Sequence, residues 1–206
     1  MKSSLVAMAI STLVCFSVAA KSGEVPAESE DAALKSTLQT CAICHGVTGR
    51  SVSPTFPNLA AQPAPYIEAQ LKAFKDQSRS DPDAQAYMWG MASQLSDPMI
   101  GKLAAYFEKQ PAGSGKLADP GMVALGKQVF EKGIPAQQIQ PCNTCHGAHG
   151  QGMTIFPRLA GQHAPYLLKQ LLVIQNALRN APVMHGVVKN LTRDQMLAVS
   201  AYLESI

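Results

Sequence analysis

Two short segments of the chain place a pair of cysteines directly before a histidine. Cys41-Ala42-Ile43-Cys44-His45-Gly46 returns as Cys142-Asn143-Thr144-Cys145-His146-Gly147. With this spacing, two thiols can bond covalently to the vinyl groups of a haem while the adjacent histidine coordinates its iron. We therefore predict two covalently bound haem c groups, each with one histidine as an axial ligand. The attachment residues are Cys41, Cys44, Cys142 and Cys145, and the ligands are His45 and His146.

Other uses of paired cysteines explain less of the pattern. Disulfides or a thiol-exchange pair would leave both histidines without a role, and a thioredoxin-like site needs a βαβ setting that the sequence does not offer. A zinc site is also disfavoured, because each motif supplies its ligands on one short turn without a second pair. Haem attachment accounts for every residue that the two motifs share.

The second axial position decides whether an iron only transfers electrons or also binds a substrate. A thioether ligand raises the reduction potential and closes the iron, whereas an open or water-bound iron permits catalysis. Of the nine methionines, only Met88 and Met184 match each other, each in a Met-x-Gly-x4-Leu-Ser/Thr frame. Most methionines fill cores, but this matched pair predicts methionine ligation at both irons. The glycine of the frame lets the backbone pass close to the haem.

The two motifs belong to a longer internal repeat. Phe56-Pro57-Asn58-Leu59-Ala60 returns as Phe156-Pro157-Arg158-Leu159-Ala160, and Ala64-Pro65-Tyr66 returns as Ala164-Pro165-Tyr166. The same order of segments in both halves indicates a duplication. We predict two tandem domains, residues 21–112 and 113–206, joined by a linker over 110–120 that is rich in Pro, Gly and Ser.

Helical patterns fill both halves, and no segment alternates in the manner of a strand. We expect helices over 65–75, 96–109, 121–132, 165–179 and 192–204, with Ser96 and Thr192 as N-caps. The polar, acidic residues 21–31 predict a loose arm. Aromatic residues make up only 6% of the chain, so each small domain lacks core material that a haem would supply. The predicted fold class is all-α, with short helices and long loops.

Residues 1–20 have the organisation of a secretory signal peptide. Lys2 precedes an apolar stretch over 5–18, and Val18-Ala19-Ala20 offers a cleavage site before polar residues. The apolar stretch is too short to span a bilayer comfortably, and no other segment is apolar for long enough. We expect export to the periplasm and no direct membrane span. The formal net charge of +3, without a block of Lys and Arg, gives no indication of nucleic-acid binding.

Several side chains outside the motifs have less specific interpretations. Pro57 and Pro157 could accept hydrogen bonds from the Nδ1–H groups of the two motif histidines, or could stiffen a loop against the haem. Tyr66 and Tyr166 could bind haem propionates, or could lie half-buried at a helix start. The remaining histidines are assigned to the surface or to helix caps: His149, His163 and His185.

Together these segments resemble the di-haem cytochrome c4 family over essentially the whole mature chain. Further matches are Gly161-Gln162-His163-Ala164-Pro165-Tyr166 and Leu95-Ser96-Asp97 with Ala104-Ala105-Tyr106-Phe107. The resemblance implies a periplasmic electron carrier made of two class I cytochrome c domains related by a pseudo-two-fold axis. It also implies His/Met ligation, with His45 and Met88 at one iron and His146 and Met184 at the other. Trp89, directly after Met88, departs from the family pattern. This departure is expected to change the solvent access and the reduction potential of the first haem.

Three functions remain open on the sequence. A carrier without catalytic residues would pass electrons from a quinol-oxidising complex or a dehydrogenase to a terminal oxidase or reductase. A di-haem enzyme of the peroxidase kind would need one open iron. A dedicated electron-transfer subunit would stay bound to a dehydrogenase. The two matched methionines favour the carrier over the enzyme.

The two halves of the chain also differ in charge. Residues 21–112 hold 8 Lys and Arg against 10 Asp and Glu, whereas residues 113–206 hold 8 against 4. Net charges of −2 and +4 make the molecule a dipole, and a dipole orients encounters with charged partners. We expect the electron donor and the acceptor to meet different domains in transient contacts.

Overall fold

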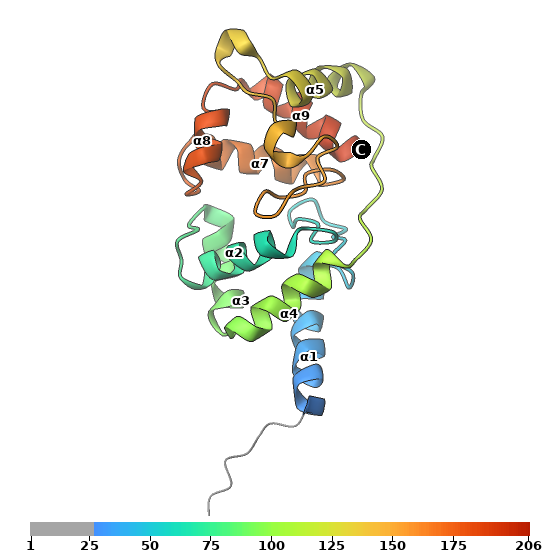
Figure 1. Ribbon diagram of the computed structural model, residues 1–206, viewed down its shortest axis with the longest axis vertical. Helices are drawn as coiled ribbons and strands as arrows, with labels where there is room; N and C mark the ends of the chain where they lie inside the picture. Colours follow the sequence, from blue (N-terminus) through green and yellow to red (C-terminus); the bar gives the residue numbers. More distant parts are fainter. Residues whose placement is uncertain (1–26) are drawn as a thin grey trace, which may run out of the picture.

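The computed structural model describes residues 27–206 as short helices joined by long loops (Figure 1). The first half contains α1 (Ala27–His45), α2 (Ala64–Lys75), η1 (Ala84–Met88), α3 (Trp89–Ser93) and α4 (Asp97–Glu108). The second half contains α5 (Pro120–Lys132), η2 (Pro135–Gln137), α6 (Asn143–His146), α7 (Ala164–Gln175), α8 (Pro182–Val188) and α9 (Arg193–Ser205). Within residues 27–206, β-type pairing is confined to two isolated bridges. The all-α prediction is confirmed.

The expected N-caps form at the last helix of each half. The Ser96 hydroxyl accepts the Met99 N–H at the start of α4. At the start of α9, Thr192 and Gln195 form a reciprocal capping box, in which each side chain accepts the other's backbone N–H. Each cap satisfies amide groups that a helix start otherwise leaves without partners.

Helix α7 ends at Gln175, earlier than the predicted end at residue 179. Ala177 adopts a left-handed conformation (φ 56°), and the amides of Leu178 and Arg179 turn back to the Val173 carbonyl. This closure satisfies the free carbonyl of the last turn and redirects the chain. Gln77 is left-handed at the equivalent place after α2 (φ 62°), so both copies turn in the same way.

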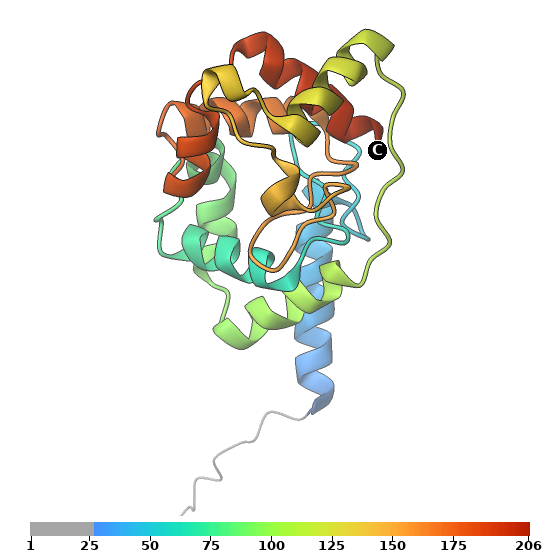
Figure 2. The same ribbon diagram turned by 45° about the horizontal axis from the view of Figure 1, so that its top comes forward.

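Helix α1 begins at Ala27, so it corrects the prediction of a loose arm for residues 27–31, whereas residues 21–26 lie outside the described part of the chain. Its sequence has no continuous apolar stripe, so periodicity did not reveal it, but Ala, Glu, Leu and Lys are strong helix formers. In both views the helix projects from the first domain (Figures 1 and 2). Near its start, Glu30 forms a 2.7 Å ion pair with Lys102 of α4.

Residues 1–26 lie outside the part of the chain that the structure describes. The predicted signal peptide over 1–20 falls there and stays a prediction. Over residues 27–206, none of the helices combines the length and the apolar character that a membrane crossing requires.

The second domain is built around one core where α5 crosses α9. Gly126 makes this crossing possible, because a Cβ at that position would lie 2.0 Å from the Ala198 carbonyl oxygen. The close approach lets α5 and α9 share a single cluster of buried side chains with α7 and α8. Its members are Val129, Phe130, Ile139, Leu167, Ile174, Val188, Leu191, Met196, Val199, Tyr202 and Leu203.

The first domain has no comparably continuous core among its described residues. One small cluster lies where α2 meets α4 and consists of Ile67, Ala104 and Phe107. A separate cluster holds Phe74, Ala84 and Ala92, with Met88 and Trp89 packed against it.

The segment between the domains runs extended along one edge of the molecule (Figure 2). Arg50 of the first domain donates to the carbonyls of Pro111 and Ala112, and the Lys116 amide donates to the Glu204 carbonyl in α9. The linker is therefore fastened to both domains, at one end by a side chain and at the other by the backbone.

The two domains meet through equivalent residues. Gln162 accepts the Asn58 N–H (2.8 Å) and donates to the Asn58 carbonyl (2.9 Å). Gln62 makes the same two bonds to the backbone of Arg158 (3.0 and 2.7 Å). Asn58 and Arg158 occupy the same position of the repeat, so this reciprocal exchange is the one that a two-fold rotation requires.

Candidate haem sites

The first cysteine-histidine motif forms the last turn of α1. Cys41, Cys44 and His45 lie three and four residues apart, which places them on one face of the helix. Gly46 then ends the helix with φ 78°, and a Cβ there would lie 2.2 Å from the Arg50 carbonyl oxygen. The local backbone therefore presents two thiols and one imidazole to the same side and turns away immediately afterwards.

The second motif is held by the short helix α6 instead of a long one. The Cys142 amide donates to the Phe130 carbonyl of α5 (2.9 Å), which ties the motif to the core of the second domain. Gly147 ends the turn with φ 84°, as Gly46 does in the first copy.

Both motif histidines are oriented by a proline carbonyl. Nδ1 of His45 lies 2.9 Å from the Pro57 oxygen, and Nδ1 of His146 lies 2.9 Å from the Pro157 oxygen. A carbonyl can only accept, so Nδ1 carries the proton and Nε2 is left with its lone pair. Burial lowers the pKa of both imidazoles, and the proline hydrogen bonds offset this only in part. Each histidine is thus a neutral base with Nε2 suited to a metal.

The cysteine thiols do not have the character of an exchange pair. None of the four is joined in a disulfide, and burial raises the pKa of Cys142 to about 11 and that of Cys41 above its usual value. Reactive redox cysteines have lowered pKa values that favour the thiolate. The structure therefore speaks against the thiol-exchange alternative.

The two methionines of the repeated frame lie on different kinds of helix. Met88 is the last residue of η1, a π-helical turn that leads directly into α3. Met184 lies in α8, an ordinary helix, and packs against the same cluster as Cys142. Single π-turns inserted into helices are frequent at functional sites, but no pattern in the sequence predicts this one.

In the first domain, an aromatic side chain connects the histidine with the methionine segment. The Phe56 ring makes edge contacts with His45 (6.1 Å between centroids) and with Tyr87, the residue before Met88 (5.4 Å). The equivalent Phe156 contacts His146 at 6.3 Å. The repeated Phe-Pro segment therefore packs on both histidines and orients them through the following carbonyl.

The glycines of the methionine frames have no explanation in the packing of the protein. A Cβ on Gly90 or Gly186 would meet no protein atom within 4 Å. Glycine inside a helix is less favourable than alanine by about 1 kcal/mol. The presence of glycine at both positions therefore fits a bound group that comes close to the backbone and leaves no room for a side chain.

The remaining histidines are placed as follows. His149 is exposed, as expected. His163 occupies the N-cap position of α7 but is buried, and its Nε2 lies 2.9 Å from the Ser51 carbonyl of the first domain. His185 is only partly buried, and its Nδ1 lies 2.9 Å from the Ile174 carbonyl.

A cluster of polar side chains at the domain interface was not predicted. Arg79 donates to Gln70 (2.8 Å) and Gln170 (3.1 Å), and Arg179 donates to Gln170 (2.6 Å) and Gln70 (2.9 Å). All four residues are repeated in the sequence, which is the signal that could have found them. Asp81 is the one carboxylate that pairs with either arginine in the described residues, at 2.9 Å from Arg79.

This interface cluster has capacity for a further anionic group. Arg179 also donates to the Tyr66 hydroxyl (3.1 Å), and the side-chain nitrogen of buried Gln170 has no hydrogen-bond partner among the described residues. Burial would raise the pKa of Tyr66, but Arg179 and Arg79 outweigh it and lower that pKa. The donor set fits the propionate carboxylates of haem.

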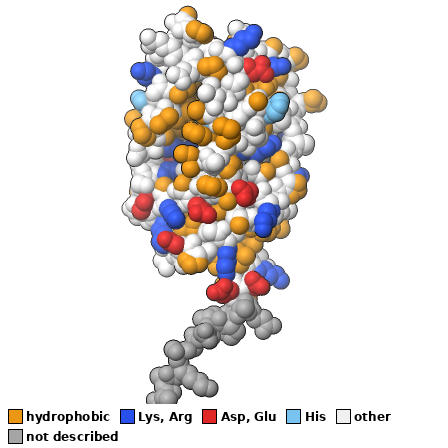
Figure 3. Space-filling view, viewed as in Figure 1, with side chains coloured by type: hydrophobic (Ala, Val, Ile, Leu, Met, Phe, Trp, Pro, Cys, Tyr) orange, Lys and Arg blue, Asp and Glu red, His pale blue; other side chains and the backbone are white. Residues whose placement is uncertain are grey.

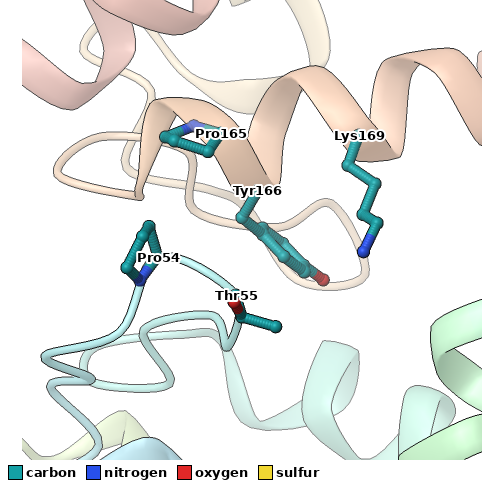
Figure 4. Close-up of a pocket in the computed structure, with 5 residues that line it drawn as sticks. All are labelled: Pro54, Thr55, Pro165, Tyr166 and Lys169. Atoms are coloured by element: carbon teal, nitrogen blue, oxygen red, sulfur yellow. The ribbon is translucent and has the colours of Figure 1, made fainter.

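A pocket of about 250 Å³ opens between the two domains (Figure 4). Its lining comes from the loop at Pro54 and Thr55 and from the first turns of α7, including Tyr166 and Lys169. Tyr66 and Tyr166 are both half-buried at a helix start, as one of their two interpretations proposed.

Comparison with known proteins agrees with this geometry. The family model for cytochrome c matches residues 33–110 and again residues 123–206. The solved cytochrome c4 of Acidithiobacillus ferrooxidans superposes with a TM-score of 0.77 at 43% identity, covering 82% of this chain and 99% of that one. Cytochrome c4 of Pseudomonas aeruginosa is 33% identical over 190 residues, which are 89% of this chain and 92% of its own.

The chain belongs to the cytochrome c4 family. Its two tandem cytochrome c domains, each with a Cys-x-x-Cys-His motif, fit two covalently bound haem c groups. It is a di-haem electron-transfer cytochrome. A further relative, the thiosulfate dehydrogenase electron acceptor of Stutzerimonas stutzeri, is 32% identical over 180 residues, 81% of this chain and 78% of its own.

Proposed function

We propose that this cytochrome c4 is a periplasmic shuttle that carries electrons between transient redox partners. His45 and Met88 would ligate the first iron, and His146 and Met184 the second. The observation that carries the proposal is the matched pair of methionine frames, in a chain whose motif histidines are already held with Nε2 available. Two closed irons transfer electrons without binding a substrate.

The haems, when bound, supply one-electron chemistry, and the protein residues set its conditions. The proline carbonyls fix each histidine in one tautomer, so the ligand does not have to reorient between redox states. The methionines exclude water and small ligands from the irons. The interface of Gln62, Gln162 and the arginine cluster holds the two domains in one arrangement, which keeps the distance between the haems constant.

The first test is the ferric absorption spectrum of the mature holoprotein. The weak far-red band that arises from sulfur-to-iron charge transfer is measured against total haem. A band that accounts for two haems per chain supports the shuttle. A band that accounts for one haem or none means an open or differently ligated iron, and the peroxidase-like enzyme would then take its place.

The charge distribution supports different docking sites for donor and acceptor. On the face in Figure 3, acidic side chains gather mainly over the first domain, in agreement with net charges of −2 and +4 for residues 21–112 and 113–206. The partners are a quinol-oxidising complex or dehydrogenase as donor and a terminal oxidase or reductase as acceptor. Turnover with one partner that responds equally to charge reversal on either domain would contradict separate docking sites.

A second candidate is a dedicated electron-transfer subunit of a dehydrogenase. The likeness to a thiosulfate dehydrogenase electron acceptor favours it. Purification from the native cell at low and at high salt separates the two functions, because a transient electrostatic complex dissociates as salt screens its charges. A dehydrogenase that co-purifies at high salt would establish the subunit, and its absence at both salt concentrations would support the shuttle.

A further inference from the structure

The residue after each proposed methionine ligand carries a ring N–H that points to a backbone carbonyl. Trp89 Nε1 donates to the carbonyl of Arg79 at 2.9 Å. In the second domain, His185 Nδ1 lies 2.9 Å from the carbonyl of Ile174. The side chains differ, but both connect the methionine segment to a fixed point of the backbone.

The two acceptor residues, Arg79 and Ile174, differ in the contacts that hold them in place. Ile174 belongs to α7 and to the core of the second domain, so the His185 contact stays within that domain. Arg79 is 7% exposed, and its guanidinium bonds to Asp81, to Gln70 and, across the interface, to Gln170. The Trp89 indole therefore bonds to Arg79, a residue whose side chain is also held by Gln170 of the second domain.

Arg79 is also fixed by the cluster against which Met88 packs. Its guanidinium lies 4.6 Å from the centre of the Phe74 ring, a cation–π contact. Phe74 forms the small cluster against which Met88 and Trp89 pack. The carbonyl that receives the indole N–H is thus part of a rigid unit that includes the surroundings of Met88.

The backbone at Met88 has particular need of such an anchor. Met88 ends a π-helical turn, and the Trp89 amide donates back to Ala84 across that turn. A π-turn is a local insertion into an α-helix and can be lost by a shift of one residue in register. Such a shift would rotate the Met88 side chain about the helix axis, away from its present direction. The hydrogen bond of the Trp89 indole opposes that rotation.

We propose that Trp89 is a positioning residue for Met88: its indole N–H fixes the methionine segment of the first haem to Arg79, at the domain interface. The proposal rests on Met88 being the sixth ligand, as proposed above. It makes methionine ligation in the first domain depend on the contact between the domains. The second domain holds Met184 by its own core.

The variant Trp89→Phe tests the proposal, because it keeps an aromatic ring and removes the N–H. Imidazole competes with methionine for ferric iron, and the loss of the far-red band measures its binding at each haem. Losing one neutral hydrogen bond should make imidazole bind about three to ten times more tightly at the first haem and leave the second unchanged. The variants Met88→Ala and Met184→Ala assign the bands to the haems.

Tyr87→Phe is the matched control on the other side of Met88. It removes the phenolic hydroxyl of a residue that is 47% exposed, and it keeps the ring that contacts Phe56. We expect imidazole affinity within two-fold of wild type at both haems. Thermal unfolding of the holoproteins, followed by circular dichroism, separates a local change at the methionine from general loss of stability.

A measurement on the wild-type protein needs no variant. Trp89 is the single tryptophan of the chain, so its indole N–H gives one resonance. Imidazole binding at the first haem should speed hydrogen exchange of that N–H, and binding at the second haem should leave it unchanged.

The outcomes distinguish the two proposals. A wild-type protein without a band that depends on Met88 would overturn the ligand assignment. With that band present, a Trp89→Phe protein whose first haem binds imidazole within two-fold of wild type would overturn the role of Trp89 alone. An indole N–H that exchanges at the same rate with and without imidazole at the first haem would also overturn it.

Discussion

The two domains come from one repeated sequence but bury their side chains in different ways. In the second domain, α5 and α9 approach closely at Gly126, and eleven buried side chains form one cluster. In the first domain, two separate clusters of three buried side chains lie beside Cys41 and beside Met88, and the buried Ile100 and Leu103 belong to neither. A duplication can therefore keep the chemistry of a site while the protein packing that supports it diverges.

The domains also differ in how they neutralise buried charge. Arg79 pairs with the buried carboxylate of Asp81, whereas Ala181 stands at the equivalent place beside Arg179. Burial alone would lower the pKa of Arg79, but the neighbouring tyrosines and Asp81 outweigh it and raise that pKa, so Arg79 is charged. The first domain thus contains a complete ion pair at the interface, and the second contributes a guanidinium without a carboxylate among the described residues.

Removal of each pair of attachment cysteines should give the largest difference between the domains. We expect Cys41→Ser with Cys44→Ser to abolish cooperative unfolding of the first domain, because its small clusters bury too little apolar surface. Cys142→Ser with Cys145→Ser should leave more protected structure, because the second domain has a continuous core. Hydrogen exchange measured by mass spectrometry gives the protection of each domain. Equal loss of protection in both variants would show that core continuity does not matter.

With both cysteine pairs replaced, we expect no stable tertiary structure in the chain. Near-ultraviolet circular dichroism during denaturation measures this directly. A cooperative transition in that protein would contradict the view that the haems complete both cores.

Asp81→Asn should destabilise the holoprotein by about 3 kcal/mol, because it leaves Arg79 buried without its carboxylate. Urea denaturation gives the free energy of unfolding. Asp83→Asn is the matched control, since Asp83 pairs with Lys169 near the surface of the same interface. Such partly exposed pairs contribute about 1 kcal/mol or less. If both variants lose the same stability, burial of the Arg79–Asp81 pair has no energetic consequence.

The smallest difference is expected between Gln62→Leu and Gln162→Leu. Each variant removes a reciprocal pair of bonds to the other domain, so each should cost about 1–3 kcal/mol of unfolding free energy. Gln162 also accepts the N–H of His163 (3.1 Å), so its loss should be the larger by a fraction of that amount. Urea denaturation of the two holoproteins measures the difference, and a larger loss for Gln62→Leu would contradict the described asymmetry.

Much of the fold followed from local patterns in the sequence. The caps at Ser96 and Thr192 and the repeat of the motifs predicted the helices and the duplication, because these signals depend on neighbours within a few residues. Helix α1 was missed because it lacks an apolar stripe, and the early end of α7 depended on Ala177 adopting a left-handed conformation. Such features are decided by contacts and backbone energies that a periodic pattern does not contain.

The sequence by itself determined the chemistry of this protein: the cysteines and histidines of two haem-attachment motifs, and the repeat that makes two domains. The tertiary structure decided which carbonyls orient the histidines, where Trp89 is anchored, and how Arg79 and Arg179 share two glutamines across the interface. The physical reason is how far apart along the chain the interacting residues lie. Covalent attachment needs residues on one turn. The hydrogen-bond partners lie ten to twelve residues apart within a domain, or about a hundred residues apart across the interface, and only folding brings them into contact.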